Sequence, residues 1–320
     1  MNQHSPHSVK LYAGSQLKRY AFGSGHPFGP DRHDAFFDRA VALGLDRQVE
    51  IMQPQSCTQA DLARFHSRDY IELLTASSVH GSGFLDCGDT PAFAGIYDAV
   101  SYVVGSALAA VEQVMNERAR RVFIPISGLH HASRSSAGGF CAASDIGVVI
   151  ETLREVHAVE RIVYVDIDAH HGDGVFYSYE SDPDVVFADI HEDGNYLYPG
   201  TGHAHEVGKG KAKGTKLNIP VMPGSKDEVF FRSWETLEEF IRSYDPQFVL
   251  LQAGADCIKG DPITHLEFTP KVHRHATERL CKYADEYCDG RILAMGGGGY
   301  NRSNLANAWC EVVEAMVNTP

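Results

Sequence analysis

Five apolar runs in the sequence each end in a short polar cluster. The runs are rich in β-branched and large apolar residues and cover residues 122–126, 162–165, 185–188, 248–251 and 292–295. Continuous runs of this kind are typical of strands that are buried on both faces of a parallel sheet. The pattern therefore predicts five strands of such a sheet.

The segments between these runs have the spacing of helices. The clearest covers residues 226–244, where apolar residues from Val229 to Ile241 recur at steps of three or four. Further helices are expected at 34–45, 94–114, 145–157, 272–287 and 303–317. Alternating strands and helices predict an α/β fold, with a mainly parallel central sheet and helices on both faces. Because no internal repeat or Pro/Ser-rich linker divides the sequence, we expect a single domain over residues 1–320.

Four long polar or glycine-rich segments remain, at 26–32, 77–90, 191–216 and 254–270. Loops of this length in a compact domain usually serve function. In open α/β sheets, ligands bind beyond the carboxyl ends of the strands. The last two segments directly follow predicted strands, so we expect long active-site loops at the C-terminal strand ends.

The polar cluster after the second run predicts a metal site. Residues two apart at the end of an extended strand project to the same side. Asp168 and His170, joined by Asp256 from the end of another strand, supply two carboxylates and one imidazole. Three protein ligands with an open position are typical of a catalytic zinc ion. The same oxygen and nitrogen donors could also hold Fe²⁺.

Candidates for proton transfer and for carbonyl binding follow other runs. His130 and His131 end the first run, and histidine titrates near neutrality. The carboxylates of Asp166 and Asp173 could each accept a hydrogen bond from one imidazole and so fix its tautomer. Tyr300 follows four glycines, which permit a backbone turn that leaves the phenol free to face the metal.

Composition and charge narrow the class of protein. The formal net charge of −14 disfavours a nucleic-acid partner, and no apolar stretch approaches the roughly 20 residues that span a bilayer. The seven cysteines are scattered and never spaced as C-x-x-C, which indicates reduced thiols. The first seven residues lack the basic start and apolar core of a secretory signal. We therefore expect a cytoplasmic protein that acts without nucleic acid or membrane.

Blocks of the sequence resemble the zinc-dependent histone deacetylase family, and specifically its class I-like branch with bacterial acetoin-utilisation relatives. The blocks lie in collinear order over most of the chain. They include Gly-Leu-His-His at 128–131, Asp-Ile-Asp-Ala-His-His-Gly-Asp-Gly at 166–174 and Gly-Gly-Gly-Gly-Tyr at 296–300. The resemblance implies an arginase/deacetylase fold that hydrolyses the amide of an N-acylated lysine, in a protein or peptide, or of a small acetylated amine.

The resemblance also implies catalytic roles. Zinc would be held by the three ligands named above. His131, paired with Asp173, would be the main general base and then the general acid. His130, paired with Asp166, would act mainly as an electrostatic partner. Tyr300 would donate a hydrogen bond to the scissile carbonyl.

Substrate contacts and a second ion are implied in the same way. Asp89 would hold the substrate backbone at the rim of a narrow tunnel, and Arg32 would line an internal channel for the leaving acetate. A structural potassium ion would bind largely to backbone carbonyls around the metal site, where Asp189 replaces a Ser frequent in relatives. The residues that would line the tunnel are Gly139, Phe140, Tyr198 and Ile263.

Three alternatives remain open. An acetylpolyamine amidohydrolase would perform the same reaction on another substrate. A dinuclear manganese ureohydrolase would need a further carboxylate late in the chain, where this sequence has Ile258. A non-catalytic acyl-lysine-binding module would have no use for an intact set of catalytic residues. The sequence leaves the acyl-chain preference, the native metal and the oligomeric state open.

Overall fold

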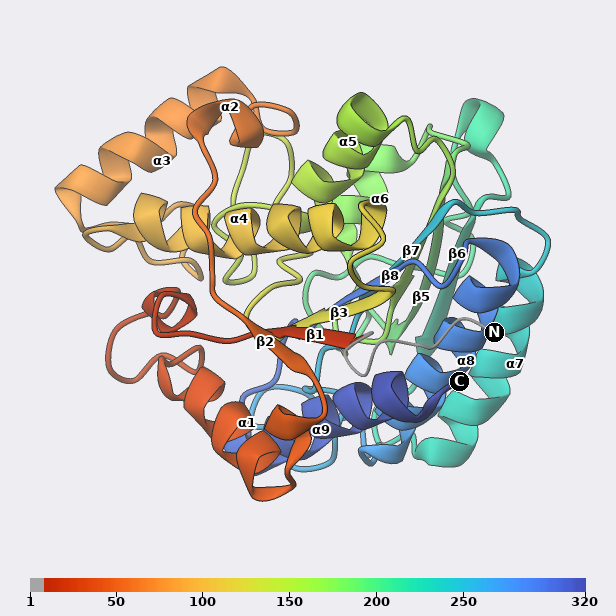
Figure 1. Cartoon of the computed structure of the whole chain (residues 1–320). Coiled ribbons are helices and arrows are strands. Elements are labelled where there is room, and N and C mark those ends of the chain that lie inside the picture. The colour runs from red at the N-terminus through yellow and green to blue at the C-terminus, as the bar shows by residue number, and fades with distance from the viewer. Residues whose placement is uncertain (1–8) are drawn as a thin grey trace.

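The computed structural model describes residues 9–320, which form an eight-stranded sheet with helices on both faces (Figure 1). The strand order is β2-β1-β3-β8-β7-β4-β5-β6, and all neighbouring strands are parallel. The predicted runs are β3 Arg121–Ile124, β4 Ile162–Asp166, β5 Val185–Glu192, β7 Phe248–Gln252 and β8 Ile292–Met295. Each is buried along its whole length, as expected for strands covered on both faces.

Three strands were not predicted. They are β1 Val9–Tyr12, β2 Glu50–Met52 and β6 Lys216–Val221. Polar residues interrupt their apolar pattern, and two of them lie at the edges of the sheet. In β1, Lys10 is buried because its ammonium donates a hydrogen bond to Gln113 at 2.7 Å and pairs with Glu50 at 3.1 Å. A buried lysine with partners in distant segments leaves no local signal of a strand.

The six predicted helices are present. They are α1 Asp31–Ala42, α4 Ile96–Met115, α5 Asp145–His157, α7 Asp227–Ile241, α8 Lys271–Tyr287 and α9 Arg302–Asn318. In Figure 1, α4 and α5 lie on one side of the sheet, and α1 and α9 lie on the other. Helix α8 contacts both α9 and α7, so α8 and α7 extend the layer that α1 and α9 begin.

Two expected loops are partly helical, and this corrects the prediction. The segment 77–90 begins inside α3 Arg68–His80, which ends where Gly81 takes a φ of +72°. The segment 26–32 runs into the first residues of α1, directly after Pro30. Short helices α2 Gln59–Leu62 and α6 Asp173–Tyr179 and the 3₁₀ turns η1 Leu17–Arg19, η2 Leu45–Arg47 and η3 Gly210–Ala212 were also not predicted.

The register of the sheet brings the predicted site together. Asp166 at the end of β4 lies beside Gln252 at the end of β7, and Gln252 lies beside Met295 at the end of β8. Strand β3 ends level with β8, since Ile124 pairs with Met295 and Pro125 has no N–H to continue the ladder. The loops after these strands therefore start from one edge.

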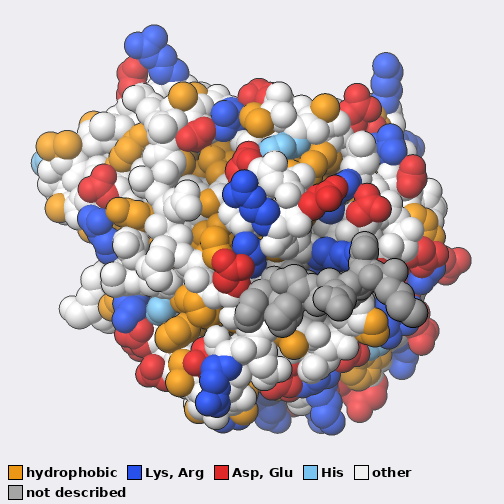
Figure 2. Space-filling model, in the orientation of Figure 1, with side chains coloured by type: hydrophobic (Ala, Val, Ile, Leu, Met, Phe, Trp, Pro, Cys, Tyr) orange, Lys and Arg blue, Asp and Glu red, His pale blue; other side chains and the backbone are white. Residues whose placement is uncertain are grey.

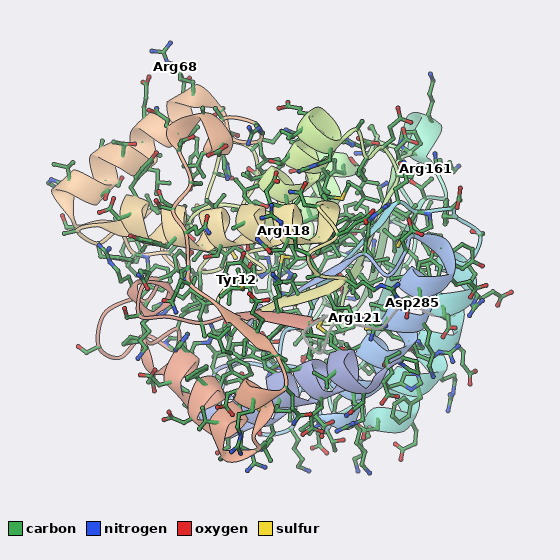
Figure 3. All side chains as sticks on the ribbon, viewed as in Figure 1. Tyr12, Arg68, Arg118, Arg121, Arg161 and Asp285 are labelled. Atoms are coloured by element: carbon green, nitrogen blue, oxygen red, sulfur yellow. The ribbon has the colours of Figure 1, made fainter. Side chains whose placement is uncertain are left out.

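The opposite end of β3 is joined to the C-terminal helices. The guanidinium of Arg121 is buried and points toward Asp285 of α8, as Figure 3 shows. It donates to the Asp285 carboxylate at 2.6 Å and to the backbone carbonyls of Met316 at 2.8 Å and Pro320 at 3.0 Å. This contact ties the sheet to the ends of α8 and α9, away from the predicted site.

On the face shown in Figure 2, acidic and basic side chains are interspersed among the described residues. No helix within residues 9–320 combines the length and the apolar character that crossing a membrane requires. The prediction about a secretory signal concerns residues 1–7, which lie outside the described part of the chain.

Candidate active site

A cavity of about 250 Å³ opens at the edge of the sheet where β3, β4, β7 and β8 end. Most of the predicted site residues line it, namely Asp89, His130, His131, Gly139, Phe140, Asp168, His170, Tyr198, Ile263 and Tyr300. Asp166 and Asp173 lie behind this lining, and Asp256 lies directly beneath its floor; each contacts one of the lining histidines. Segments that are far apart in sequence thus meet at one place.

Asp168, His170 and Asp256 converge at the floor of the cavity. They are buried, and one ligand atom from each lies within 4.8 Å of the others. The Nδ1 atom of His170 lies 3.0 Å from Asp168 Oδ1 and 3.2 Å from Asp256 Oδ2. A tetrahedral zinc ion with bonds of about 2.0 Å separates its ligand atoms by about 3.3 Å. The spacing of the three atoms therefore fits one such ion.

The other oxygens of the two carboxylates are already occupied. Asp168 Oδ2 accepts hydrogen bonds from the Gln252 amide at 2.8 Å and from the Gly298 N–H at 2.9 Å. Asp256 Oδ1 accepts one from the Ala169 N–H at 2.8 Å. These donors turn the remaining oxygen of each carboxylate toward His170. Such partners behind the ligands are typical of metal sites, because they orient the ligating atoms.

Gly298 is required by the close approach of the glycine run to this floor. A Cβ atom at residue 298 would lie 2.1 Å from Asp256 Oδ2 and 2.8 Å from Asp168 Oδ2. Any side chain there would displace a carboxylate oxygen. The glycines before Tyr300 thus allow the backbone to approach the carboxylates closely, in addition to allowing it to turn.

His130 and His131 each pair with a different carboxylate. His130 Nδ1 lies 2.8 Å from Asp166 Oδ2, and His131 Nδ1 lies 2.6 Å from Asp173 Oδ1. Their Nε2 atoms, 3.1 Å apart, face the cavity side of both rings. Each carboxylate accepts the Nδ1 proton of its imidazole, which leaves Nε2 free to exchange a proton.

The two histidines have opposite pKa shifts. Burial lowers the pKa of His130, but the carboxylates of Asp166 and Asp168 outweigh it and raise the pKa to about 9. Burial and the neighbouring His130 charge lower the pKa of His131 to about 4. The environment therefore favours a charged His130 beside a neutral His131.

Tyr300 lies at the cavity wall, beside Phe140, with ring centroids 5.7 Å apart. Burial and the Asp256 carboxylate raise the pKa of its phenol well above the usual value, so the hydroxyl keeps its proton and can donate. Arg32 lies behind it. The Arg32 guanidinium donates to the carbonyls of Gly299 at 2.8 Å and Gly297 at 2.6 Å. Arg32 thus contacts the backbone that carries Tyr300.

The predicted tunnel residues form the entrance to the cavity. The rings of His131 and Tyr198 are 5.0 Å apart, and Gly139 leaves room between them. A Cβ atom at residue 139 would lie 2.3 Å from His131 Cδ2. Phe140 and Ile263 complete an apolar wall around the polar floor. Asp89 is exposed at the mouth.

Several residues that hold the site were not predicted. The Tyr164 hydroxyl donates to Asp166 Oδ2 at 2.5 Å, although Tyr164 lies inside an apolar run with no local signal. Asp145 accepts hydrogen bonds from the N–H groups of Gly128 and Leu129, at 2.7 and 2.8 Å, and so supports the loop that leads to His130. A signal for Gln252 was present, because it is the first polar residue after a predicted strand.

Asp189 is paired within the protein. Its Oδ1 atom lies 2.8 Å from His191 Nδ1, and its Oδ2 atom accepts the Gly172 N–H at 3.0 Å. Both side chains are fully buried. Strand β5 continues for four residues beyond the predicted run. The prediction stopped at residue 188 because the polar residues at 189 and 191 end the apolar pattern.

This geometry can be compared with known proteins. The histone deacetylase domain family matches residues 26–316. The acetoin utilization protein AcuC of Bacillus subtilis is 34% identical over 314 residues, which cover 95% of this chain and 81% of that protein. Histone deacetylase HDAC1 of Drosophila melanogaster is 32% identical over 319 residues, which cover 97% of this chain and 60% of that protein.

A solved structure, the HDA15 HD domain, superposes with a TM-score of 0.90 over 97% of this chain and 88% of that chain, at 23% identity. At this identity the similarity shows the fold, and the predicted arginase/deacetylase architecture is confirmed. The family match over most of the chain and the identity to AcuC show the family as well as the fold. The chain belongs to the histone deacetylase family.

Proposed function

We propose that this chain is a zinc-dependent amidohydrolase that removes an acetyl or another acyl group from the side chain of an N-acylated lysine. One observation carries the proposal. Two carboxylate oxygens and one imidazole nitrogen converge at the floor of an apolar cavity, with His131 and Tyr300 in its lining. Membership of the histone deacetylase family supports hydrolysis of an acetylated substrate.

The donor set suits one zinc ion, and Fe²⁺ remains an alternative. A bound zinc ion would lower the pKa of a water molecule and polarise the substrate carbonyl. The burial of two carboxylates beside each other supports a bound cation, because burial and the Asp168 charge raise the pKa of Asp256 to about 7. Asp168, His170 and Asp256 are the only group of three such residues with metal-site spacing within residues 9–320, which supports one ion over two.

In this proposal, His131 moves the protons. With Asp173 on its Nδ1 atom, its Nε2 atom accepts the proton of the attacking water. The carbonyl oxygen gains negative charge as the tetrahedral intermediate forms, and the Tyr300 hydroxyl donates a hydrogen bond to it. His131 then gives its proton to the leaving amine as the C–N bond breaks. His130, held by Asp166, contributes charge to the same site.

The tunnel suits an acyl-lysine. The apolar wall of Phe140, Tyr198 and Ile263 would pack against the methylene stem of a lysine side chain. The exposed carboxylate of Asp89 would accept hydrogen bonds from substrate backbone N–H groups at the rim. Arg32, behind the glycine run, would line the exit of acetate.

Further proposals concern the whole chain. We propose one deacetylase domain over residues 1–320 and a cytoplasmic location, which the seven cysteines without disulfide partners support. A structural potassium ion beside β4 would have the Asp189–His191 pair as its neighbour.

A side-by-side assay of three substrate types tests the function. Release of the carboxylic acid, which is acetate for an acetyl group, is measured with acetyl-lysine peptides, with peptides carrying longer acyl groups, and with acetylated polyamines. The metal content of the same sample is determined. We expect release from acyl-lysine peptides with one metal ion per chain. Release only from polyamines would indicate an acetylpolyamine amidohydrolase, and two manganese ions with urea formation would indicate a ureohydrolase. Peptide binding without release would indicate a non-catalytic module.

A further inference from the structure

The loop that carries Asp89 is held by a single carboxylate, that of Asp86. Asp86 Oδ1 accepts hydrogen bonds from the backbone N–H groups of Gly88, Asp89 and Thr90, each at 2.9 Å. Its Oδ2 atom accepts the Thr90 hydroxyl at 2.6 Å. Burial raises the pKa of the Asp86 carboxyl, but these hydrogen bonds hold it below its usual range. The charged form of Asp86 therefore fixes the backbone on both sides of Asp89.

The same hydrogen-bond chain reaches the tunnel wall. Thr90 is fully buried, and its Oγ1 atom accepts the Phe140 N–H at 3.0 Å. Phe140 has a φ of +68°, a conformation that is unfavourable for a residue with a side chain. Its carbonyl accepts the Tyr20 hydroxyl at 2.7 Å. Phe140 is thus held in this conformation from both of its peptide groups.

His26 joins the two parts from outside. Its ring lies edge-on to Phe140 with centroids 4.5 Å apart, and its Nε2 atom lies 3.4 Å from the Asp89 carbonyl. Asp89 and Phe140 line the cavity, whereas Asp86 is not part of its lining. An effect of Asp86 on substrates must therefore act through its neighbours.

We propose that Asp86 is a positioning residue that sets the affinity for the peptide backbone of the substrate, by fixing Asp89 at the rim and, through Thr90, Phe140 in the tunnel wall. This inference rests on the proposed function. The loss of Asp86 affects a peptide, which reaches the rim, more than a short acetyl-lysine amide, which occupies only the tunnel. It acts mainly on KM, because the residues at the floor are untouched.

The test is a double-mutant cycle of Asp86→Ala and Asp89→Ala, assayed with an acetyl-lysine peptide and with a short acetyl-lysine amide. We expect Asp86→Ala to lower kcat/KM about tenfold more for the peptide than for the amide, mostly through KM. On the peptide, the double variant should lose no more relative to Asp89→Ala than Asp86→Ala loses on the short amide, because only the route through Thr90 and Phe140 remains once Asp89 is gone. Equal losses on both substrates, or two single losses on the peptide that multiply in full in the double variant, would overturn the inference.

Thr90 provides a matched pair of variants. Thr90→Val keeps the shape and removes the hydroxyl, so Phe140 loses its partner and activity on both substrates falls. Thr90→Ser keeps the hydroxyl and should restore most of it; equal activity of the two variants would contradict the link to Phe140. Should Asp86→Ala not fold, as judged by its Tm, Asp86→Asn takes its place. The amide oxygen can still accept the backbone N–H groups, but the NH₂ group meets the Thr90 hydroxyl, so a smaller loss on the peptide is expected. If the unsubstituted protein hydrolyses neither substrate, the proposed function fails, and this inference with it.

Discussion

The Nε2 atoms of His130 and His131 lie 3.1 Å apart, while their Nδ1 atoms contact two different carboxylates. Two rings at this distance cannot both carry a proton on Nε2 without repulsion. Burial and a charge on His130 therefore favour a neutral His131 before the reaction, and the same repulsion favours release of a proton that His131 has accepted. In the proposed mechanism, the pair divides into one imidazole that provides charge and one that moves protons.

His131→Ala should abolish turnover and leave the metal content near one ion per chain. The variant removes the proposed proton acceptor, whose ring nitrogens contact Asp173 and His130 and none of Asp168, His170 and Asp256. The measurement is kcat together with metal analysis of the same preparation. Loss of the metal along with activity would mean that the ligands are assigned wrongly.

Tyr300→Phe should lower kcat by about 10²–10³ and change KM little, because the hydroxyl acts on charge that develops only in the transition state. The substitution keeps the ring, so its packing against Phe140 remains. Steady-state kinetics with one peptide are sufficient. An essentially unchanged kcat would refute the role given to this phenol.

Asp261→Asn should lower kcat by about tenfold through Tyr300. Asp261 Oδ2 accepts the Tyr300 N–H at 2.8 Å, and Oδ1 accepts the Ile263 N–H at 3.1 Å. An amide places an NH₂ group against one of these donors and shifts the loop, and a displacement of about 1 Å in an active site can cost 10²-fold.

Asp245→Asn serves as the matched control for Asp261→Asn. It removes an exposed carboxylate that pairs with Arg161 at 3.1 Å and precedes the start of β7, whereas the site lies beyond the other end of that strand. Exposed pairs contribute about 0–1 kcal/mol, so this variant should keep its activity and its Tm nearly unchanged. Equal kinetics of the two variants would show that Asp261 does not position Tyr300.

Acid should destabilise the protein partly through His66. The ring is buried, and its Nε2 atom accepts the Ser144 N–H at 3.0 Å, so folding favours the neutral form. Burial lowers the pKa of His66 from 6.5 to about 4. The unfolded state therefore binds the proton first, and stability present above about pH 6.5 is lost as the pH falls toward about 4. A shift of about 2.5 units corresponds to about 3 kcal/mol at most.

The check uses His66→Gln, which keeps an acceptor for Ser144 and does not titrate. Free energies of unfolding in urea are measured for both proteins between pH 7 and pH 4. The unsubstituted protein should lose more stability over this range, with a difference on the order of 2 kcal/mol. Parallel pH profiles would show that His66 does not contribute.

The sequence was sufficient to predict the site residues that directly follow a buried strand. The runs that became β3, β4, β7 and β8 have uninterrupted apolar residues, and the polar residues after them could be expected to meet at one edge. The structure brings the side chains of His130, Asp168 and Asp256 to one cavity floor. Their roles stay predictions.

The residues that support the site could not be predicted, because their contacts depend on register and on loop paths. Tyr164 is an ordinary strand residue until β4 is placed so that its hydroxyl reaches Asp166. Asp86 and Asp261 lie in polar loops, where a carboxylate is expected to face solvent. Only the folded loops show that each accepts several backbone N–H groups. Helix α3 was missed because its few apolar residues, such as Tyr70 and Leu74, give a weak pattern.

The most direct test of the account is a zinc titration of metal-free protein, with acetate release from an acetyl-lysine peptide as the readout. If Asp168, His170 and Asp256 hold one catalytic ion, the rate rises in proportion to added zinc and levels off at one equivalent per chain, and Asp256→Ala shows no rise. A rate that is independent of zinc, or that levels off only at two equivalents, would contradict the account.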